Sequence, residues 1–415
     1  MRVAVVGTGI SGMVSAYLLS ENHDITVFEV NDCIGGHTHT VGVAGPDGPL
    51  GVDTGSIIFN DRTCLNFIRL LERLGVASKP SDMSFGVRCE DTGLEYAVTS
   101  LNALFAQRRN LFRPAFHRML LDMLRFLRQG RRLVAQPADD ISMGRFLDRH
   151  GYGTMFREKF LLPMLAAIWS SEPSHTEAFP ARHFLRFFEN HGLLSICNQP
   201  EWRVITGGSS AYVKQLTAPY ATRIRLSLPV RSIRRANDAV LLTTSDSSEE
   251  SFDHVVVATH ADEALAMLAD PTEREREILS ALPFRSNDVV LHTDTSLLPR
   301  SRRAWASWNY HCTGQEQGCP MVTYNMNRLQ GLDAGKTYCV TLNRRDVINA
   351  DRILGSYAYE HPLFTAEGLR AQARHGEISG VGRTHYCGAY WGYGFHEDGV
   401  KSALAVCRYF GKGLT

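Results

Sequence analysis

The most constraining stretch of the sequence is at its start, where residues 3–12 read Val-Ala-Val-Val-Gly-Thr-Gly-Ile-Ser-Gly. An apolar run of strand length meets a G-x-G-x-x-G turn, and residues 13–20 then read as a helix. Such a turn leaves backbone N–H groups free at a helix N-terminus, where the helix dipole attracts an anion. The sequence therefore predicts a βαβ unit that binds the pyrophosphate of a dinucleotide, and a structural βαβ turn that binds nothing is the alternative. The residues expected at the phosphates are Gly7, Gly9, Ile10, Ser11 and Gly12.

The acidic partner of this turn is Glu29, at the end of a second apolar strand, residues 25–28. A carboxylate roughly 20 residues after the glycines is placed to bind the ribose hydroxyls of a dinucleotide. The same carboxylate would repel a 2′-phosphate, so the spacing favours an unphosphorylated ribose.

A second pair of glycines follows the acidic strand, and it helps to choose between cofactors. An NAD-binding unit needs no such pair. A longer cofactor, which continues past the pyrophosphate, needs further positions where the backbone can approach it closely. The additional cofactor-binding candidates are Gly35, Gly36, His37, Thr38, Thr54, Gly55 and Ser56.

This E-x5-G-G arrangement resembles the signature of the flavin-dependent amine oxidase, protoporphyrinogen oxidase and phytoene desaturase superfamily. The resemblance implies FAD, bound non-covalently because no S-G-G-C-like setting precedes the last helix. It also implies a backbone contact between Val230 and the cofactor, where the residues alone indicate a plain strand position. One departure is His37, which stands where the superfamily usually has an arginine and so lacks its bidentate fork.

The C-terminal stretch, residues 386–399, is rich in glycine and aromatic residues and leads into a predicted helix over 400–410. The N-terminus of that helix suits an isoalloxazine ring, because its dipole stabilises negative charge on the reduced flavin. We expect Gly388 to contact the cofactor, and Gly399 and Val400 to supply the amides. The run G-A-Y-W-G-Y-G-F-H-E-D-G resembles a bacterial group of FAD-binding proteins related to the oxidase-like N-terminal region of plant cyclopropane fatty acid synthases.

The resemblance and the order of predicted elements give the fold class. We expect an α/β protein with a Rossmann-type FAD-binding domain and an inserted α+β substrate domain, in which helices lie on one side of an antiparallel sheet. The expected FAD-binding domain is discontinuous, over residues 1–95, 200–282 and 375–415. The substrate domain is expected to comprise residues 96–199 and 283–374.

Composition, cysteine content and net charge argue against several other classes of function. Of the 415 residues, 44% are hydrophobic and 21% charged, as in ordinary globular proteins. A first strand at residue 3 leaves no room for a signal peptide, so we expect a cytoplasmic protein. Nine scattered cysteines without a C-x-x-C pair predict neither a disulfide nor a metal site. A net charge of +1 gives no reason to expect nucleic acid.

One segment, Arg108 to Arg132, combines an apolar face with eight arginines, and Asp122 is its only acidic residue. A basic amphipathic helix is a candidate for peripheral contact with an anionic membrane. The alternative is an ordinary domain helix with its arginines in solvent. In the membrane reading, Leu111, Phe112 and Phe116 lie at the mouth of a tunnel to the flavin.

The candidate catalytic residues lie in the C-terminal stretch. His396 is the candidate acid–base group, because its expected place is beside the flavin ring and imidazole titrates near pH ~6.5. Tyr390 and Tyr393 are candidates to wall the cavity. The alternatives are that His396 only donates a hydrogen bond to the cofactor and that the two tyrosines only pack.

Two departures from the superfamily bear on the chemistry. Ala389 stands where many relatives have an aspartate that binds the ribityl chain, so Asp53 or a water is a possible substitute. The region 284–292 contains no lysine, whereas amine oxidases commonly place one near flavin N5.

We therefore expect an FAD-dependent oxidoreductase that desaturates or oxidises a lipophilic substrate, such as a fatty acyl chain or a phospholipid acyl group. A flavin amine oxidase is the alternative enzyme. A third reading is a non-catalytic flavoprotein that is the partner of a lipid-modifying enzyme.

Overall fold

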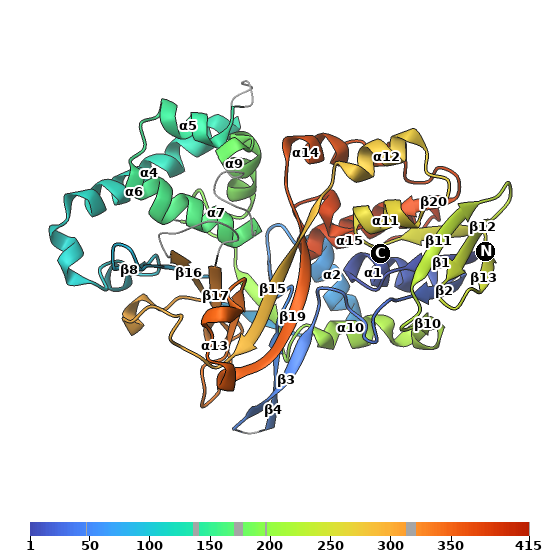
Figure 1. The fold of residues 1–415 in the computed structure, drawn as a ribbon, viewed down its shortest axis with the longest axis horizontal. Helices are drawn as coiled ribbons and strands as arrows, with labels where there is room; N and C mark the ends of the chain where they lie inside the picture. Colours follow the sequence, from blue (N-terminus) through green and yellow to red (C-terminus); the bar gives the residue numbers. More distant parts are fainter. Residues whose placement is uncertain (47, 136–140, 170–176, 196, 313–320, 415) are drawn as a thin grey trace.

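The computed structural model describes residues 1–415 apart from 47, 136–140, 170–176, 196, 313–320 and 415. Figure 1 shows two halves joined by the long strands β15 (Phe284–His292) and β19 (Ile353–Pro362). Both chain termini lie in the half that contains β1 (Arg2–Val6). That half holds the nucleotide turn, and we call the other the substrate half.

The nucleotide half is built on a parallel sheet of five strands in the order β10-β2-β1-β14-β20. Buried valines dominate β1 and β14, as expected for strands covered on both faces. The sequence predicted β1 and β2 to within one residue. Residues 224–235 are divided between two sheets, because β10 ends in this sheet and β11 begins another. The bounds of the other four strands are β2 Asp24–Phe28, β10 Ile224–Arg225, β14 His254–Val257 and β20 Thr384–Tyr386.

Two different layers cover the two faces of this sheet. Val3, Val5 and Val27 pack with helices α1 (Ile10–Leu19), α2 (Leu65–Leu74), α10 (Ser210–Thr217) and α15 (His396–Tyr409). Ala4, Val6 and Phe28 point to the opposite face. There they pack against an antiparallel meander and two helices: β11 Val230–Arg235, β12 Val240–Thr244, β13 Glu249–Phe252, α11 Ala261–Met267 and α12 Glu273–Ser280.

The larger sheet has seven strands in the order β19-β15-β18-β17-β16-β7-β8. Its strands are antiparallel except for one parallel pair, β16 and β7, so the predicted antiparallel sheet is mixed. Strands β7 (Phe85–Cys89) and β8 (Leu94–Ala97) belong to this sheet, although residues 1–95 were expected in the FAD-binding domain. The chain therefore leaves the nucleotide half before residue 85. The remaining strands are β16 Trp308–Cys312, β17 Met321–Asn325 and β18 Cys339–Leu342.

Helices cover one side of the larger sheet, as the sequence predicted. The 3-10 turn η1 (Arg108–Phe112) precedes α4 (Pro114–Ala135), so the predicted helix is broken before Pro114. Phe116 is fully buried in the core of this half, which rules it out as part of a tunnel mouth. The neighbouring elements are α3 Leu101–Leu104, α5 Met143–Arg149, α6 Thr154–Phe156, the π-helix η2 Arg157–Leu161, α7 Leu162–Trp169 and α9 Ala181–Asn190.

The remaining described elements are short. They are β3 Thr40–Gly45, β4 Gly48–Asp53, β5 Ile58–Asn60, β6 Ser78–Pro80, β9 Trp202–Ile205, α13 Met326–Leu329, α14 Ala366–Gln372, and the helical turns η3 Ala218–Arg223, η4 Arg302–Ala304, η5 Arg345–Val347, η6 Ala350–Arg352, η7 His375–Glu377 and η8 Ala389–Trp391. Within the described residues, no helix has the length and apolar character needed to cross a membrane.

The last helix begins four residues earlier than the sequence predicted. The Asp398 carboxylate accepts a hydrogen bond from the Phe395 backbone N–H, which stabilises a helix start at His396. Gly399 is thus inside the helix, and its N–H donates to the Phe395 carbonyl. The expectation that the Gly399 amide faces the flavin is therefore wrong.

Gly399 instead sets the distance between the first and last helices of the chain. A Cβ atom at this position would lie 2.5 Å from Cγ2 of Ile10, a closer approach than packed atoms allow. The absence of a side chain lets α15 pack directly on the start of α1. This contact brings the N-termini of the two helices together.

We expect Gly399→Ala to lower the free energy of unfolding by about 1–3 kcal/mol, the usual cost of overpacking a tight contact. Gly376→Ala is the matched control, because nothing lies within 4 Å of its added Cβ. Denaturant titration of both variants measures the difference. Equal stability of the two variants would show that α1 and α15 are not in tight contact.

Candidate cofactor and substrate site

The nucleotide turn has the features of an anion site. Gly9 is the N-cap of α1, whose first turn has neither a side-chain cap nor an acidic residue. The N–H groups at this end therefore have no capping partner from a side chain. A Cβ atom at Gly9 would meet nothing within 4 Å, so there is open space beside the turn. The position fits a pyrophosphate against Gly9, Ile10 and Ser11.

Glu29 lies next to this turn and is buried. Its Oε2 atom accepts hydrogen bonds from the Thr8 backbone N–H at 2.9 Å and the Thr8 hydroxyl at 2.5 Å. Its Oε1 atom accepts from the backbone and side-chain N–H groups of Asn31, both at 2.9 Å. Glu29 therefore also holds the turn to the loop after β2, in addition to its predicted role at the ribose.

The two glycine loops after β2 lie against the turn and against each other. Gly36 has a φ of +58°, and a Cβ atom there would lie 3.0 Å from the Cα atom of Gly9. The Ser56 N–H donates to the His37 carbonyl, and the Thr54 N–H donates to the His39 carbonyl. The Thr38 hydroxyl lies 2.6 Å from the Tyr212 hydroxyl on α10. The predicted residues of both loops therefore converge on the turn.

Asp53 does not serve as a substitute for the missing ribityl carboxylate. Its buried carboxylate accepts hydrogen bonds from Thr40, from the backbone N–H and hydroxyl of Ser209, and from Gln330. These donors join the β3–β4 hairpin, the start of α10 and the end of α13. Burial nevertheless raises the pKa of Asp53 to about 6. Its role is to hold three segments together.

His37 is part of a histidine cluster. Its ring stacks on that of His260 with centroids 5.7 Å apart, and the His361 ring meets it edge-on at the same distance. Burial, together with the neighbouring His361 and His260, lowers the pKa of His37 to about 3. His37 is therefore neutral at pH 7, and does not replace the charge of the superfamily arginine.

His396 is the first residue of α15 and is also buried. Its ring stacks on Phe67 with centroids 4.7 Å apart. Burial lowers the pKa of His396 to about 4, against a smaller opposing effect of a hydrogen bond with the Ile58 backbone. At pH 7 the imidazole is neutral, and its Nε2 atom is buried without a hydrogen-bond partner. His396 is therefore equipped to accept a hydrogen bond or a proton at Nε2.

A cavity adjoins His396 where the two halves meet. Three histidines, His37, His361 and His396, line this cavity. The other lining residues are apolar or carry uncharged polar groups: Gly55, Ser56, Ile57, Ile58, Ile168, Trp308, Tyr324, Leu329, Pro362, Phe364, Tyr393, Gly394 and Phe395. The indole N–H of Trp308 is buried there without a partner. Among the described lining residues, the Trp308 indole N–H and the His396 Nε2 atom are thus buried polar groups without a hydrogen-bond partner.

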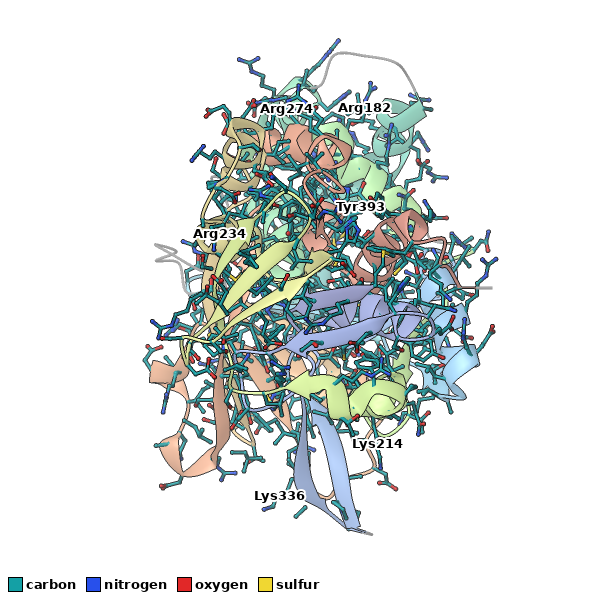
Figure 2. All side chains as sticks on the ribbon, turned by 90° about the vertical axis from the view of Figure 1, so that its right-hand side faces the viewer. Arg182, Lys214, Arg234, Arg274, Lys336 and Tyr393 are labelled. Carbon is teal, nitrogen blue, oxygen red and sulfur yellow. The ribbon has the colours of Figure 1, made fainter. Side chains whose placement is uncertain are left out.

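Only one of the two candidate tyrosines lines this cavity. Tyr393 does so and is half-buried; it is labelled in Figure 2, far from Lys336 in that view. The turn η8 directs Tyr390 into the core of the nucleotide half, where it packs on Phe284 and Trp391. The prediction that Tyr390 walls the cavity is therefore wrong. Sequence reasoning also missed Trp308, on a strand with no glycine or motif to mark it.

The other predicted cofactor residues lie around the parallel sheet. Val230 begins β11 and packs in the same apolar cluster as Val6 and Phe28, beneath the nucleotide turn. The Gly388 N–H donates to the Ser402 hydroxyl at 3.0 Å. Val400 is fully buried within α15, in the cluster that contains Met13, and lies one residue further into the helix than Gly399. The expectation that the Val400 amide faces the flavin is therefore wrong as well, whereas the cofactor contacts of Val230 and Gly388 stay predictions.

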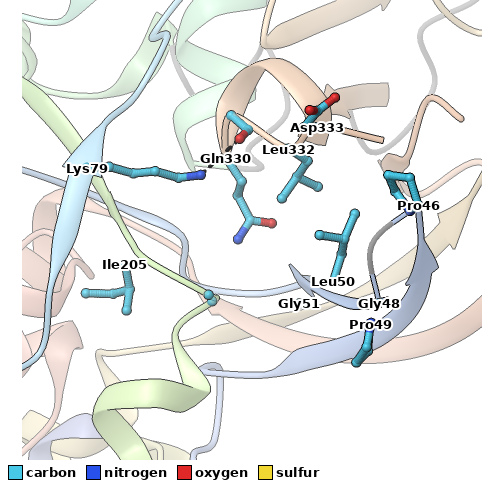
Figure 3. Close-up of a pocket in the computed structure, with 13 residues that line it drawn as sticks. Pro46, Gly48, Pro49, Leu50, Gly51, Lys79, Ile205, Gln330, Leu332 and Asp333 are labelled. Atoms are coloured by element: carbon cyan, nitrogen blue, oxygen red, sulfur yellow. Dashed lines mark hydrogen bonds between the residues drawn. The ribbon is translucent and has the colours of Figure 1, made fainter. Parts of the chain in front are cut away.

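A second cavity, of about 400 Å³, lies elsewhere and contains none of the predicted site residues (Figure 3). The β3–β4 hairpin, Lys79, the Gly207-Gly208 turn and the residues after α13 line it. The Lys79 ammonium donates to the Gly331 carbonyl at 2.9 Å. The volume of a cavity therefore does not by itself identify the catalytic site of this chain.

One group of side chains has the spacing of metal ligands. The thiols of Cys89 and Cys312 and the carboxylate of Asp91 lie within 4.8 Å of one another. The Lys159 ammonium is 3.1 Å from Asp91 and 3.3 Å from the Cys312 sulfur. This ammonium already supplies the positive charge that the group can bind.

Comparison with known proteins gives the family. The family model described as "Flavin containing amine oxidoreductase" matches residues 10–311. A Mycobacterium tuberculosis protein named "Putative flavin-containing monoamine oxidase AofH" is 27% identical over 278 residues, which are 65% of this chain and 59% of that protein. The chain therefore belongs to the flavin-containing amine oxidoreductase family, which implies FAD as its cofactor, and it spans less than two thirds of the length of this relative.

Solved structures share the fold over the whole chain. Wild-type putrescine oxidase bound to putrescine aligns with a TM-score of 0.70 and 14% identity, over 99% of both chains. A fatty acid isomerase from P. acnes that produces CLA aligns with a TM-score of 0.71 and 17% identity, over 99% of this chain and 98% of that one. At these identities the likeness establishes the fold alone.

The residues present fit FAD. The uncapped N-terminus of α1 and the open space at Gly9 suit the pyrophosphate, and Glu29 suits the adenosine ribose. The loops at Gly36 and Gly55 continue from the turn towards the cavity at His396. When bound, FAD would supply an acceptor for a hydride equivalent.

We expect Glu29→Gln to reduce FAD affinity at least tenfold. The change keeps the shape of the buried side chain but removes the charge from its hydrogen bonds, each worth about 1.5–3 kcal/mol. Acid precipitation of the purified proteins, followed by chromatography of the supernatant, measures the bound cofactor and tests whether it is non-covalent. Full FAD occupancy in the variant would exclude Glu29 from the site, and colour retained in the wild-type pellet would indicate a covalent flavin.

We expect the protein to lose stability as the pH falls from about 6.5 towards 4. Burial lowers the pKa of His361 and His396 to about 4, and that of His37 to about 3. The unfolded chain, with histidine pKa values near ~6.5, then binds more protons than the folded chain, so acid favours unfolding. Asp53 and Asp398, with pKa values raised to about 6, oppose this trend but are fewer.

Thermal unfolding between pH 7 and pH 5 checks this expectation. The melting temperature should fall across the range, and His396→Phe should make the fall shallower by removing one buried titrating group. A melting temperature that rises towards pH 5 would mean that the raised carboxyl groups dominate.

Proposed function

We propose that this enzyme oxidises or desaturates a neutral, lipophilic substrate such as a fatty acyl chain. The observation that carries the proposal is the lining of the cavity, which contains neither a carboxylate nor an ammonium group among the described residues. Ile168, Leu329 and Phe364 offer apolar contact, which favours a substrate that gains by leaving water.

Two polar atoms would orient such a substrate. The Trp308 indole N–H can donate to a carbonyl or carboxyl oxygen, and the His396 Nε2 atom can accept a proton or a hydrogen bond. Because the pKa of His396 is about 4, it would act as a base or acceptor and not as an acid at pH 7. Tyr393 and Trp308 would exclude water from the site.

Amine oxidation is the second candidate function, favoured by the name of the Mycobacterium tuberculosis relative and by the putrescine oxidase neighbour. Histidines neutral at pH 7 are compatible with an uncharged amine. The region 284–292 contains no lysine, and the fatty acid isomerase shows that the same fold is compatible with an acyl substrate. These features favour the acyl substrate.

Anaerobic mixing of the FAD-loaded protein with fatty acids or acyl lipids, and separately with putrescine and cyclohexylamine, tests the proposal. We expect the visible absorption of the flavin to bleach with acyl compounds. Bleaching with amines alone would contradict the proposal and support the amine oxidase. Bleaching with neither class, in a protein with full FAD, would favour the non-catalytic partner of a lipid-modifying enzyme.

A pair of variants tests whether the cavity is the substrate site. Ile168→Asp places a carboxylate in the apolar lining and should slow bleaching by acyl compounds at least tenfold, because the acyl chain would meet a buried charge. Ile168→Val keeps the site apolar and is the control. FAD content should stay the same in both, and equal bleaching rates would place the substrate elsewhere.

A further inference from the structure

The outer end of the substrate half carries exposed apolar side chains. We call this region the arginine-rich tip, and it comprises residues 98–113 and 300–304. It is one surface, because η4 packs against both α3 and β8. Phe112 is 87% exposed and Leu101 is 77% exposed, and Val98 and Leu111 are exposed beside them. In Figure 1, β8 and α4 lie at the end of the molecule opposite to β1.

The arginines of the tip keep their positive charge uncompensated. Arg108 donates to the Phe105 carbonyl and the Asn102 side chain, and Arg109 donates to the Gly93 carbonyl. These acceptors are neutral. Three more exposed arginines, Arg300, Arg302 and Arg303, lie in or beside η4, and none of these five exposed arginines forms an ion pair with a described residue.

The carboxylates near the tip are already engaged. Glu95 is buried and accepts the backbone N–H groups of Arg300 and Ser301. Asp91 is paired with the Lys159 ammonium. The surface of the tip therefore combines exposed apolar groups with a positive charge.

Helix α4 follows the tip in the chain. Its ion pairs show which of its arginines are free to contact a ligand. Arg118 and Arg125 are both paired with the buried Asp122, so two of the eight predicted arginines have a structural role. Leu121 and Leu124 are exposed further along the helix. The exposed arginines after them are Arg128, Arg131 and Arg132.

We propose that the arginine-rich tip docks the enzyme on an anionic lipid bilayer, with Leu101 and Phe112 entering the acyl region and the arginines contacting lipid phosphates. Arginine beside exposed leucine and phenylalanine fits a headgroup boundary, where charge and apolar area both contribute to binding. A nucleic acid would use the charge but leave Phe112 and Leu101 in water. The proposal stands whether or not the substrate of the proposed function is a lipid.

The packing of the substrate half links the tip to the cavity. Phe116 and Met119, on the inner side of α4, belong to the same apolar cluster as residues packed around the cavity, including Trp308, Tyr324 and Tyr393. If the tip docks on a membrane, this apolar cluster lies between the membrane surface and the cavity at His396.

Co-sedimentation of the full-length, FAD-loaded protein with vesicles tests the proposal. We expect binding to vesicles of phosphatidylcholine and phosphatidylglycerol (about 7:3) at low salt, and none to phosphatidylcholine alone. Binding should be lost at 1 M salt, where the Debye length shortens to about 3 Å. Absence of binding to the anionic vesicles at low salt would overturn the proposal.

Two pairs of variants assign the binding to the tip. Arg300→Glu with Arg303→Glu should weaken binding at least tenfold, whereas Arg274→Glu with Arg276→Glu, the same charge change on α12, should not (Arg274 is labelled in Figure 2). Leu101→Ser with Phe112→Ser should weaken binding at low salt, and Leu354→Ser, exposed on β19, is the control. FAD content should be unchanged in all four proteins.

The outcomes separate this proposal from its alternatives. Equal losses in the tip and control variants would mean that binding follows net charge and not the tip, and would overturn it. Displacement by an oligonucleotide at equal phosphate concentration, with no effect of Phe112→Ser, would identify a polyanion site instead. Flavin bleaching by dispersed substrates measures the proposed function independently of vesicle binding.

Discussion

The contact between the first and last helices of the chain is the constraint on which the site depends. Parallel pairing places β1 between β2 and β14, and β20 next to β14, so α1 and α15 begin at the same edge of the sheet. Gly399 then lets the two helices touch at Ile10. Residues nearly 400 positions apart thereby form one site, with the nucleotide turn at one side and His396 at the other.

The sequence identified the parts of this site that depend on the backbone. Glycines at 7, 12, 35 and 36 are there because a turn or a close approach requires them, and such requirements are local enough to be recognised. Helix α2 carries a signal of the same local kind, because it ends at Gly75 in the left-handed conformation.

What the sequence could not show depends on contacts between distant segments. The start of α15 was misjudged because Asp398 reads as a surface residue until its hydrogen bond to the Phe395 N–H is known. Trp308 carries no motif, and reaches the cavity only because β16 pairs with β7 and β17. Tyr390 and Tyr393 are three residues apart, and only the turn between them decides which one faces the cavity.

Burial also changes the chemistry expected from residue types. The three histidines that line the cavity, His37, His361 and His396, are neutral at pH 7, so the site combines uncharged acceptors with apolar walls. A low-polarity site of this kind is consistent with a substrate that carries no charge at its reacting carbon. At the position where the superfamily usually has an arginine, His37 stacks on His260.

The central claim is that the flavin ring lies between the N-terminus of α15 and the apolar cavity lined by Trp308 and Phe364. A crystal structure of the protein purified with its FAD tests it most directly. We expect the pyrophosphate at the N-terminus of α1 and the isoalloxazine beside His396, with its open face towards Trp308. An isoalloxazine in the cavity beside Lys79 and Gly207, or one separated from His396 by other side chains, would contradict the account.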